Sequence, residues 1–230
     1  MVTVSTSIGN EELNPVAIGV DVGKVSDPTA IAVAEVSQTP TGRFFTNRGR
    51  QPIPAMETQY TLRHIERLAL GTSYPDVATK IADLLCSQNF KRRHVQVLVD
   101  VTGVGRPVYD ALERETQTRQ YHALSVTLKP ISFVHGEKYN RRVGSLGKAY
   151  LVSRLQALLQ CGQIHAPETA EVRAMLEELR VYEIKIDQDG KDTYGAFKVG
   201  AHDDLATALA LACLENPWEY GVSYISNIWK

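Results

Sequence analysis

Apolar and β-branched residues form short runs along the first third of the chain, and turn-forming residues separate these runs. The runs that predict strands are, in order, VAIGVDV at residues 16–22, TAIAVAEV, RFFTNR and QYTLRHIERLAL. GKVSDP and TPTG have the composition of turns, and the polar, proline-rich residues 47–57 predict a loop. Short strands joined by tight turns predict an antiparallel meander.

Farther along, apolar residues recur with the three-to-four-residue period of amphipathic helices. The expected helices begin at Pro75, begin at Pro107, span residues 145–160, span residues 170–179, and cover HDDLATALALACLE. Between them, VQVLVDVTG predicts a central strand, HALSVTLKPISF predicts another, and VYEIKID pairs with TYGAFKV as a hairpin.

This order of elements predicts a mixed α/β fold, in which an antiparallel meander and parallel strands share one sheet flanked by helices. The chain has 230 residues and shows no internal repeat or linker. We therefore expect a flexible leader at residues 1–14 and a single domain at residues 15–230.

Composition places the chain among ordinary globular proteins, with 43% hydrophobic and 22% charged residues. No apolar run approaches the ~18 residues that a membrane-spanning helix needs. The start of the chain lacks the features of a signal peptide, so a cytoplasmic protein is expected. Cys86, Cys161 and Cys213 lie far apart in apolar helical contexts, which predicts buried free thiols.

Aspartates stand at the ends of three predicted elements. Asp21 interrupts the apolar strand IGVDVG, Asp100 ends VQVLVD, and Asp203 and Asp204 open the final helix. A buried carboxylate is costly unless it is paired or binds a cation, and Mg²⁺ or Mn²⁺ prefers such oxygen ligands. Carboxylates from adjacent strands and a facing helix end can hold two ions about 3.5–4 Å apart, as in enzymes that cut phosphodiester bonds.

Each of these aspartates also has a purely structural interpretation. Asp21 and Asp100 can accept backbone hydrogen bonds in the turns that follow their strands. Asp203 and Asp204 can serve as an N-cap and a first-turn acid of the final helix. The aspartates taken together, in this order of elements, favour the metal site.

The local sequence around these aspartates resembles the nuclease domain of phage terminase large subunits. The resemblance covers about residues 16–214 and is carried by AIGVDVGKVSDPTAIAVAE, YTLRHIERLALGTSYPDV, LVDVTGVGRPVYDAL, SLGKAYLVSRLQALLQCGQIHAP and KVGAHDDLATALALA. It implies a ribonuclease H-like fold and an endonuclease that uses two Mg²⁺ or Mn²⁺ ions to cut double-stranded phage DNA during packaging. It also implies that Asp21 and Asp100 are metal ligands, joined by Asp203 and Asp204.

The resemblance has one departure and one uncertain position. In the family an ATPase precedes this domain, and here no GxxxxGK[ST] phosphate loop is present. The chain is then an excised domain, a split terminase with a separate packaging ATPase, or a prophage-derived nuclease of a bacterial host. A portal or a small terminase subunit are further expected partners. Asp27 matches a family position, but a turn before Pro28 explains it better.

The formal net charge of −1 means that DNA binding must depend on local basic patches. The best candidate is KYNRRVGSLGK, with Lys138, Arg141, Arg142 and Lys148, although a solvated loop is an equal alternative. The cluster Lys91–Arg92–Arg93 enters the Asp100 strand from its opposite end and is expected to be solvated surface. His202 can touch the site or only assist the helix start.

Three functions remain open at this point. The first is a terminase-type DNA endonuclease. The second keeps the fold but changes the substrate to branched DNA, as in a resolvase, or to an RNA–DNA hybrid. The third is a non-catalytic module for DNA-packaging assembly, which the intact acidic positions disfavour.

Overall fold

The computed structural model describes residues 13–23, 27–46, 52–181, 183–186, 192–195 and 202–218. The strands are β1 Val16–Asp21, β2 Ala30–Thr46, β3 Pro52–Arg67, β4 His94–Asp100, β5 Ser125–Val134, β6 Tyr139–Asn140, β7 Ser145–Gly147, β8 Ile164–His165, β9 Glu183–Ile186 and β10 Asp192–Gly195. The helices are α1 Tyr74–Leu85, the 3-10 turn Gln88–Phe90, α2 Gly105–Thr118, α3 Lys148–Gln160, α4 Ala170–Val181 and α5 Asp204–Ala212.

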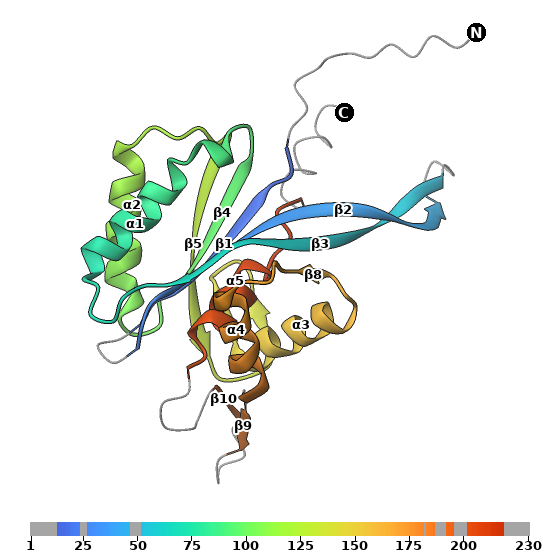
Figure 1. The fold of residues 1–230 in the computed structure, drawn as a ribbon. Coiled ribbons are helices and arrows are strands. Elements are labelled where there is room, and N and C mark those ends of the chain that lie inside the picture. Colours follow the sequence, from blue (N-terminus) through green and yellow to red (C-terminus); the bar gives the residue numbers. More distant parts are fainter. Residues whose placement is uncertain are drawn as a thin grey trace.

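Eight strands form one mixed sheet in the order β6-β7-β5-β4-β1-β2-β3-β8 (Figure 1). β1, β2 and β3 pair antiparallel, whereas β4 pairs parallel with both β1 and β5. The predicted meander with added parallel strands is therefore confirmed. The predicted hairpin is also present, because β9 and β10 pair antiparallel in a separate small sheet.

The sheet separates two apolar layers. On one face, α1 and α2 pack against alternate residues of the central strands, including Ile18 and Val97. On the other face, α5, α3 and α4 pack against the intervening residues, including Ala17 and Leu98 (Figure 1). Both layers are fully packed, so the two faces of the central strands are buried, which explains their almost continuous apolar sequence.

Close approach of α5 to β1 depends on Gly19. A Cβ atom at this position would lie 2.0 Å from the Ala208 carbonyl oxygen and 2.5 Å from the Ala212 nitrogen. These contacts are to backbone atoms, which cannot move aside as a flexible side chain can. The glycine therefore sets the depth at which α5 lies on the sheet, and with it the position of the helix N-terminus.

Gly19→Ala is expected to destabilise the protein by about 3 kcal/mol, because one extra methyl group forces α5 off the sheet. Urea unfolding followed by circular dichroism measures the change. Gly42→Ala is the control, since a Cβ there meets nothing within 4 Å and strains only a backbone with φ of 76°. The control should lose about 1 kcal/mol or less. Equal stability of Gly19→Ala and wild type would contradict this packing.

Several local predictions were wrong. TPTG is not a turn, because β2 continues through it to Thr46, and residues 52–57 belong to β3 rather than to a loop. The register shifts between Pro40 and Phe44. This β-bulge accommodates Pro40 and Gly42 without ending the strand. β2 and β3 thus form a long ribbon that extends beyond the rest of the sheet (Figure 1).

Two smaller corrections concern a helix and the thiols. α3 begins at Lys148, because Ser145–Gly147 form the short strand β7. All three cysteines are free, but only Cys213 is buried; Cys86 is partly exposed and Cys161 is exposed. Cys161 follows the last residue of α3 as its C-cap, where solvent reaches the side chain. Across the part of the chain that the structure describes, no helix is long and apolar enough to span a membrane.

Candidate active site

Asp21 and Asp100 lie at the same edge of the sheet. They end β1 and β4, which are neighbouring parallel strands with Val20 opposite Val99. The alternation of each strand places both carboxylates on the face that α5 covers, since Ala17 and Leu98 belong to that layer. Asp100 is 8% exposed, and its Oδ1 accepts a hydrogen bond from the Thr102 N–H at 2.7 Å. The turn contact proposed for Asp100 is thus present.

The N-terminus of α5 brings Asp203 and Asp204 to this edge. Asp203 occupies the N-cap position, yet its side chain makes no capping hydrogen bond. Its Oδ2 lies 4.0 Å from the Lys148 Nζ, and 31% of its side chain is exposed. Asp204 is the first residue of α5 and is buried, with 5% exposure.

The acidic groups influence one another strongly at Asp21. Burial raises the pKa of Asp21 well above its ordinary value, and the negative charges of Asp100, Asp203 and Asp204 raise it further, while Lys148 lowers it. The effect of Asp203 on this pKa is larger than the effect of Asp204. An additional positive charge at this position would remove the conflict between the carboxylates.

The chemistry of these donors fits a divalent cation that prefers oxygen ligands, such as Mg²⁺ or Mn²⁺. All four side chains are carboxylates, and their combined charge exceeds that of Lys148, which lies near Asp203, and Arg67, which pairs with Asp204. Within the described ranges, no three acidic, histidine or cysteine side chains already lie close enough together to form a complete metal site. The four aspartates are therefore a convergence of negative charge and not a closed coordination shell.

Two residues beside Asp204 were not predicted from the sequence. Arg67, the last residue of β3, donates from Nε to Asp204 Oδ2 at 2.5 Å, and its Nη2 donates to Glu178 Oε1. Glu178 comes from α4, and its Oε2 accepts the Ala206 N–H at 2.8 Å. Burial raises the pKa of Glu178 to about 7, against the lowering effects of the Ala206 N–H and of Arg67. Neither residue stands out in the sequence, because each belongs to an ordinary amphipathic element.

Glu215 is a second buried acid that the sequence did not identify. Its side chain is 0% exposed and accepts hydrogen bonds from Lys129 Nζ, from the Tyr139 hydroxyl and, at 2.8 Å, from Gln96 Nε2. Arg141 Nε lies 3.6 Å from its Oε1. This carboxylate joins β4, β5, β6 and the basic segment on the α5 face of the sheet.

The predicted DNA-contact residues divide into two pairs. Lys148 lies beside Asp203 and 5.3 Å above the ring of Phe133, and Arg141 approaches Glu215. Lys138 lies just before β6 and Arg142 lies in the turn between β6 and β7, and both are exposed. Of the four predicted DNA-contact residues, Lys148 therefore borders the acidic site, whereas Arg141 lies beside Glu215, which follows the other end of α5.

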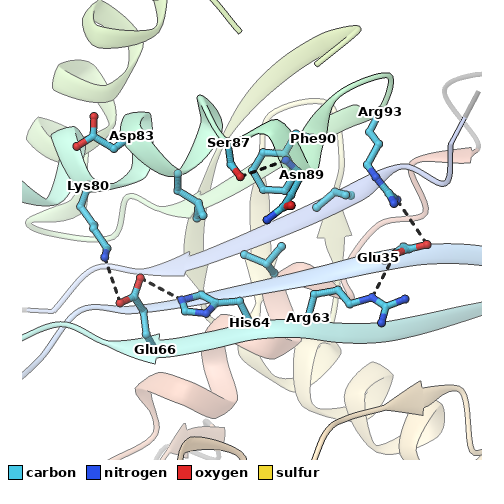
Figure 2. A pocket seen from close by; sticks show the side chains of 13 residues that line it. Glu35, Arg63, His64, Glu66, Lys80, Asp83, Ser87, Asn89, Phe90 and Arg93 are labelled. Atoms are coloured by element: carbon cyan, nitrogen blue, oxygen red, sulfur yellow. Dashed lines mark hydrogen bonds and ion pairs between the residues drawn. The ribbon is translucent and has the colours of Figure 1, made fainter. Parts of the chain in front are cut away.

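A groove of about 660 Å³ lies on the opposite face of the sheet (Figure 2). Its apolar floor includes Val16, Val33 and Phe90, which belong to the α1–α2 layer. Figure 2 shows Glu35 between Arg63 and Arg93, with separations of 3.1 and 3.4 Å. The charged side chains of this groove thus pair with one another.

The same groove corrects the interpretation of the Lys91–Arg92–Arg93 cluster. Lys91 and Arg92 are exposed as predicted, but only 18% of the Arg93 side chain is exposed. Its Nη1 donates to the Asn14 carbonyl oxygen at 2.8 Å. His202 is also placed: its Nδ1 lies 3.4 Å from Asp204 Oδ1, so it touches the acidic group.

The fold of this chain matches solved protein structures, although its sequence matches no family model. No family model and no curated protein matches the chain. The large terminase nuclease of thermophilic phage G20c matches with TM-score 0.57 and 22% identity, covering 88% of this chain and 82% of that one. The large terminase nuclease domain of Thermus phage P74-26 matches with TM-score 0.52 and 20% identity, over 88% and 81% of the two chains.

A third match comes from a virus of animals. The human cytomegalovirus terminase nuclease domain gives TM-score 0.50 at 13% identity, covering 88% of this chain and 83% of that one. The chain therefore has the ribonuclease H-like fold of terminase nuclease domains, as its local sequence indicated.

Proposed function

We propose that this chain is a metal-dependent DNA endonuclease of the terminase large-subunit type, acting in DNA packaging. The observation that carries the proposal is the convergence of Asp21, Asp100 and the α5 aspartates at one edge of the sheet, where their charges raise the pKa of Asp21. The fold shared with terminase nucleases supports the same conclusion. A structural role for the aspartates alone would not explain why like charges gather at the partly buried carboxylate of Asp21.

In the proposed site, Asp21, Asp100 and the N-terminus of α5 hold two Mg²⁺ or Mn²⁺ ions. Such ions, when bound, activate a water molecule and stabilise the leaving oxygen of the phosphodiester. Asp21 and Asp100 would both contribute ligands, because β1 and β4, which they end, are neighbouring parallel strands. Lys148, 4.0 Å from Asp203, supplies a positive charge where the DNA phosphate approaches.

The test is cleavage of supercoiled plasmid DNA at low salt, with Mn²⁺, Mg²⁺ or EDTA. Metal-dependent nicking and linearisation by the wild type, lost in Asp100→Asn, is the expected result. Equal cleavage by Asp100→Asn and wild type would reject the role of this carboxylate. Parallel assays on linear, branched and RNA–DNA hybrid substrates separate the terminase proposal from its relatives, since preference for a branched or hybrid substrate would favour those instead.

The segment from Lys138 to Lys148, called the basic turn below, is the proposed contact with the DNA backbone. Lys138→Ala and Arg142→Ala are each expected to weaken binding to a duplex and to reduce the slope of log affinity against log salt by about one. Fluorescence anisotropy between 50 and 200 mM salt measures both quantities on protein held in EDTA. Lys91→Ala is the matched control, because Lys91 is exposed near the opposite end of β4. An equal loss in the control would show that general charge, not this turn, binds DNA.

A chain of net charge −1 should bind DNA weakly by itself. Attachment to a packaging ATPase, portal or small terminase subunit would raise the local concentration of DNA at the site without new contacts. We therefore propose that residues 15–230 act as one nuclease domain within such an assembly.

A further inference from the structure

The two aspartates that begin α5 have different surroundings. Both oxygens of Asp204 are engaged, Oδ2 by the Arg67 Nε at 2.5 Å and Oδ1 by the His202 Nδ1 at 3.4 Å. Among the described residues, the cation beside Asp203 is Lys148 at 4.0 Å, and the Asp203 side chain makes no capping hydrogen bond to its own helix. The Asp203 side chain is also more exposed to solvent than the Asp204 side chain, at 31% against 7%.

Arg67 lies in the same cross-strand row of the sheet as Asp21. It lies opposite Ala30, and Ala30 lies opposite Asp21 on the other side. Because Ala30 ends at a methyl group, the guanidinium of Arg67 can reach over it to the start of α5. The planar fork then contacts two carboxylates at once, Asp204 through Nε and Glu178 through Nη2.

Glu178 completes this connection. One of its oxygens accepts from Arg67 and the other accepts the Ala206 N–H at 2.8 Å. Ala206 belongs to the first turn of α5, where backbone N–H groups have no partner within the helix. Helix α4 therefore supplies the cap that Asp203 does not supply, and the carboxylate of Asp203 remains available.

From these contacts we infer that Asp204 is not a metal ligand: Arg67 and Glu178 hold it as a positioning group, and Asp203 is the α5 carboxylate that faces Asp21 and Asp100. The inference rests on the proposed nuclease function. It assigns Arg67 and Glu178 as positioning residues, because they act on the site through the first turn of α5.

The experiment measures Mn²⁺ binding to the full chain without DNA, by electron paramagnetic resonance of free Mn²⁺. The variants are Asp203→Asn, Asp204→Asn, Arg67→Lys and the double variant Arg67→Lys/Asp204→Asn. Arg67→Lys keeps the positive charge but loses the planar fork, so it separates geometry from charge. Melting temperatures in EDTA confirm that each variant is folded at the temperature of the titration.

Asp203→Asn is expected to weaken Mn²⁺ binding by about 100-fold or more. Asp204→Asn and Arg67→Lys are each expected to weaken it by about 10-fold, the size typical of residues behind the ligands. The double variant should be no weaker than the single ones, because Arg67 and Asp204 act as one unit. Plasmid cleavage should fall in the same order.

Two results would overturn the assignment. If Asp204 were a ligand that Arg67 withholds, Asp204→Asn would match the loss in Asp203→Asn, or Arg67→Lys would bind Mn²⁺ more tightly than wild type. Failure of the nuclease proposal gives a different result. In that case Asp21→Asn, Asp100→Asn and Asp203→Asn would all bind Mn²⁺ as the wild type does.

Discussion

Asp21→Asn is expected to reduce plasmid cleavage by about a thousandfold or more while the protein stays folded. Asparagine keeps the size of the side chain but removes the charge that a divalent cation requires. Asp21 is the residue on which the effects of Asp100, Asp203 and Asp204 converge. A gel assay of nicked and linear product with Mn²⁺ measures the loss, with wild-type protein beside it.

The same substitution should stabilise the metal-free protein. The folded pKa of Asp21 lies above its ordinary value of 3.8, because burial and neighbouring carboxylates oppose ionisation. The stability linked to this group is therefore complete below the unfolded pKa and is lost as pH rises through the folded pKa. Asp21→Asn in EDTA should melt higher than wild type at pH 8, by roughly 2–4 °C for each kcal/mol relieved.

The difference in melting temperature should shrink as pH falls and disappear well below the ordinary pKa of 3.8, because the carboxyl of Asp21 is then protonated in both states. Mn²⁺ should reverse the order at pH 8, since a cation bound to the native state stabilises only the protein that retains its ligand. Asp76→Asn is a control at an exposed first-turn aspartate of α1. An Asp21→Asn protein that cleaves as wild type does would reject Asp21 as a ligand.

Glu215→Ala is expected to destabilise the protein by about 3–5 kcal/mol, the usual cost of removing one partner from a buried ion pair. The substitution takes away the acceptor that Lys129 and Gln96 share, and Gln96 is 6% exposed. It also removes the buried charge near Arg141, so the basic turn loses its anchor. Urea unfolding monitored by circular dichroism gives the free energy of unfolding.

Glu168→Ala is the matched control for Glu215→Ala. Its side chain is 88% exposed and lies 3.9 Å from Arg173, so its loss should change stability by less than about 0.5 kcal/mol. Glu215→Gln should fall between the two, because it keeps the shape and one acceptor. If Glu215→Ala unfolds at the same urea concentration as Glu168→Ala, the buried network contributes nothing to stability.

The grouping of Asp21, Asp100, Asp203 and Asp204 at one edge of the sheet was predictable from the sequence, because each lies at the end of an element with a clear local pattern. β1 and β4 are apolar strands with an aspartate at the carboxyl end, and parallel pairing alone brings Asp21 beside Asp100. The start of α5 is marked by the HDD sequence and by the alanine-rich helix that follows. These features depend on local patterns, so they were visible before the structure.

Arg67, Glu178 and Glu215 were not predictable in the same way. The register of β3 on β2 shifts between Val33 and Ala34, so no pattern in the sequence places Arg67 in the row of Asp21. Glu178 contacts α5 because α4 packs against it. Glu215 lies in a bend after α5, and no sequence pattern predicts that bend. The position of each of these three residues depends on how helices and strands pack together, which the local sequence pattern of one element does not determine.

The ribbon of β2 and β3 was misread for another reason. Proline and glycine in TPTG indicate a turn in most contexts, but here a β-bulge accommodates them within a continuous strand. The error divided β2 into two predicted strands, TAIAVAEV and RFFTNR, and misplaced the start of β3, while the expectation of antiparallel pairing was right. The topology was therefore predictable where the turn positions were not.

The central claim is that Asp21, Asp100 and Asp203 hold divalent cations at the carboxyl ends of β1 and β4. The most direct test is a crystal structure of the protein grown with Mn²⁺, with anomalous diffraction recorded to locate the manganese. Anomalous peaks are expected between Asp21 and Asp100, with Asp203 as a further ligand and Asp204 still bound to Arg67. A fully occupied manganese site elsewhere, with these carboxylates free of metal, would contradict the claim.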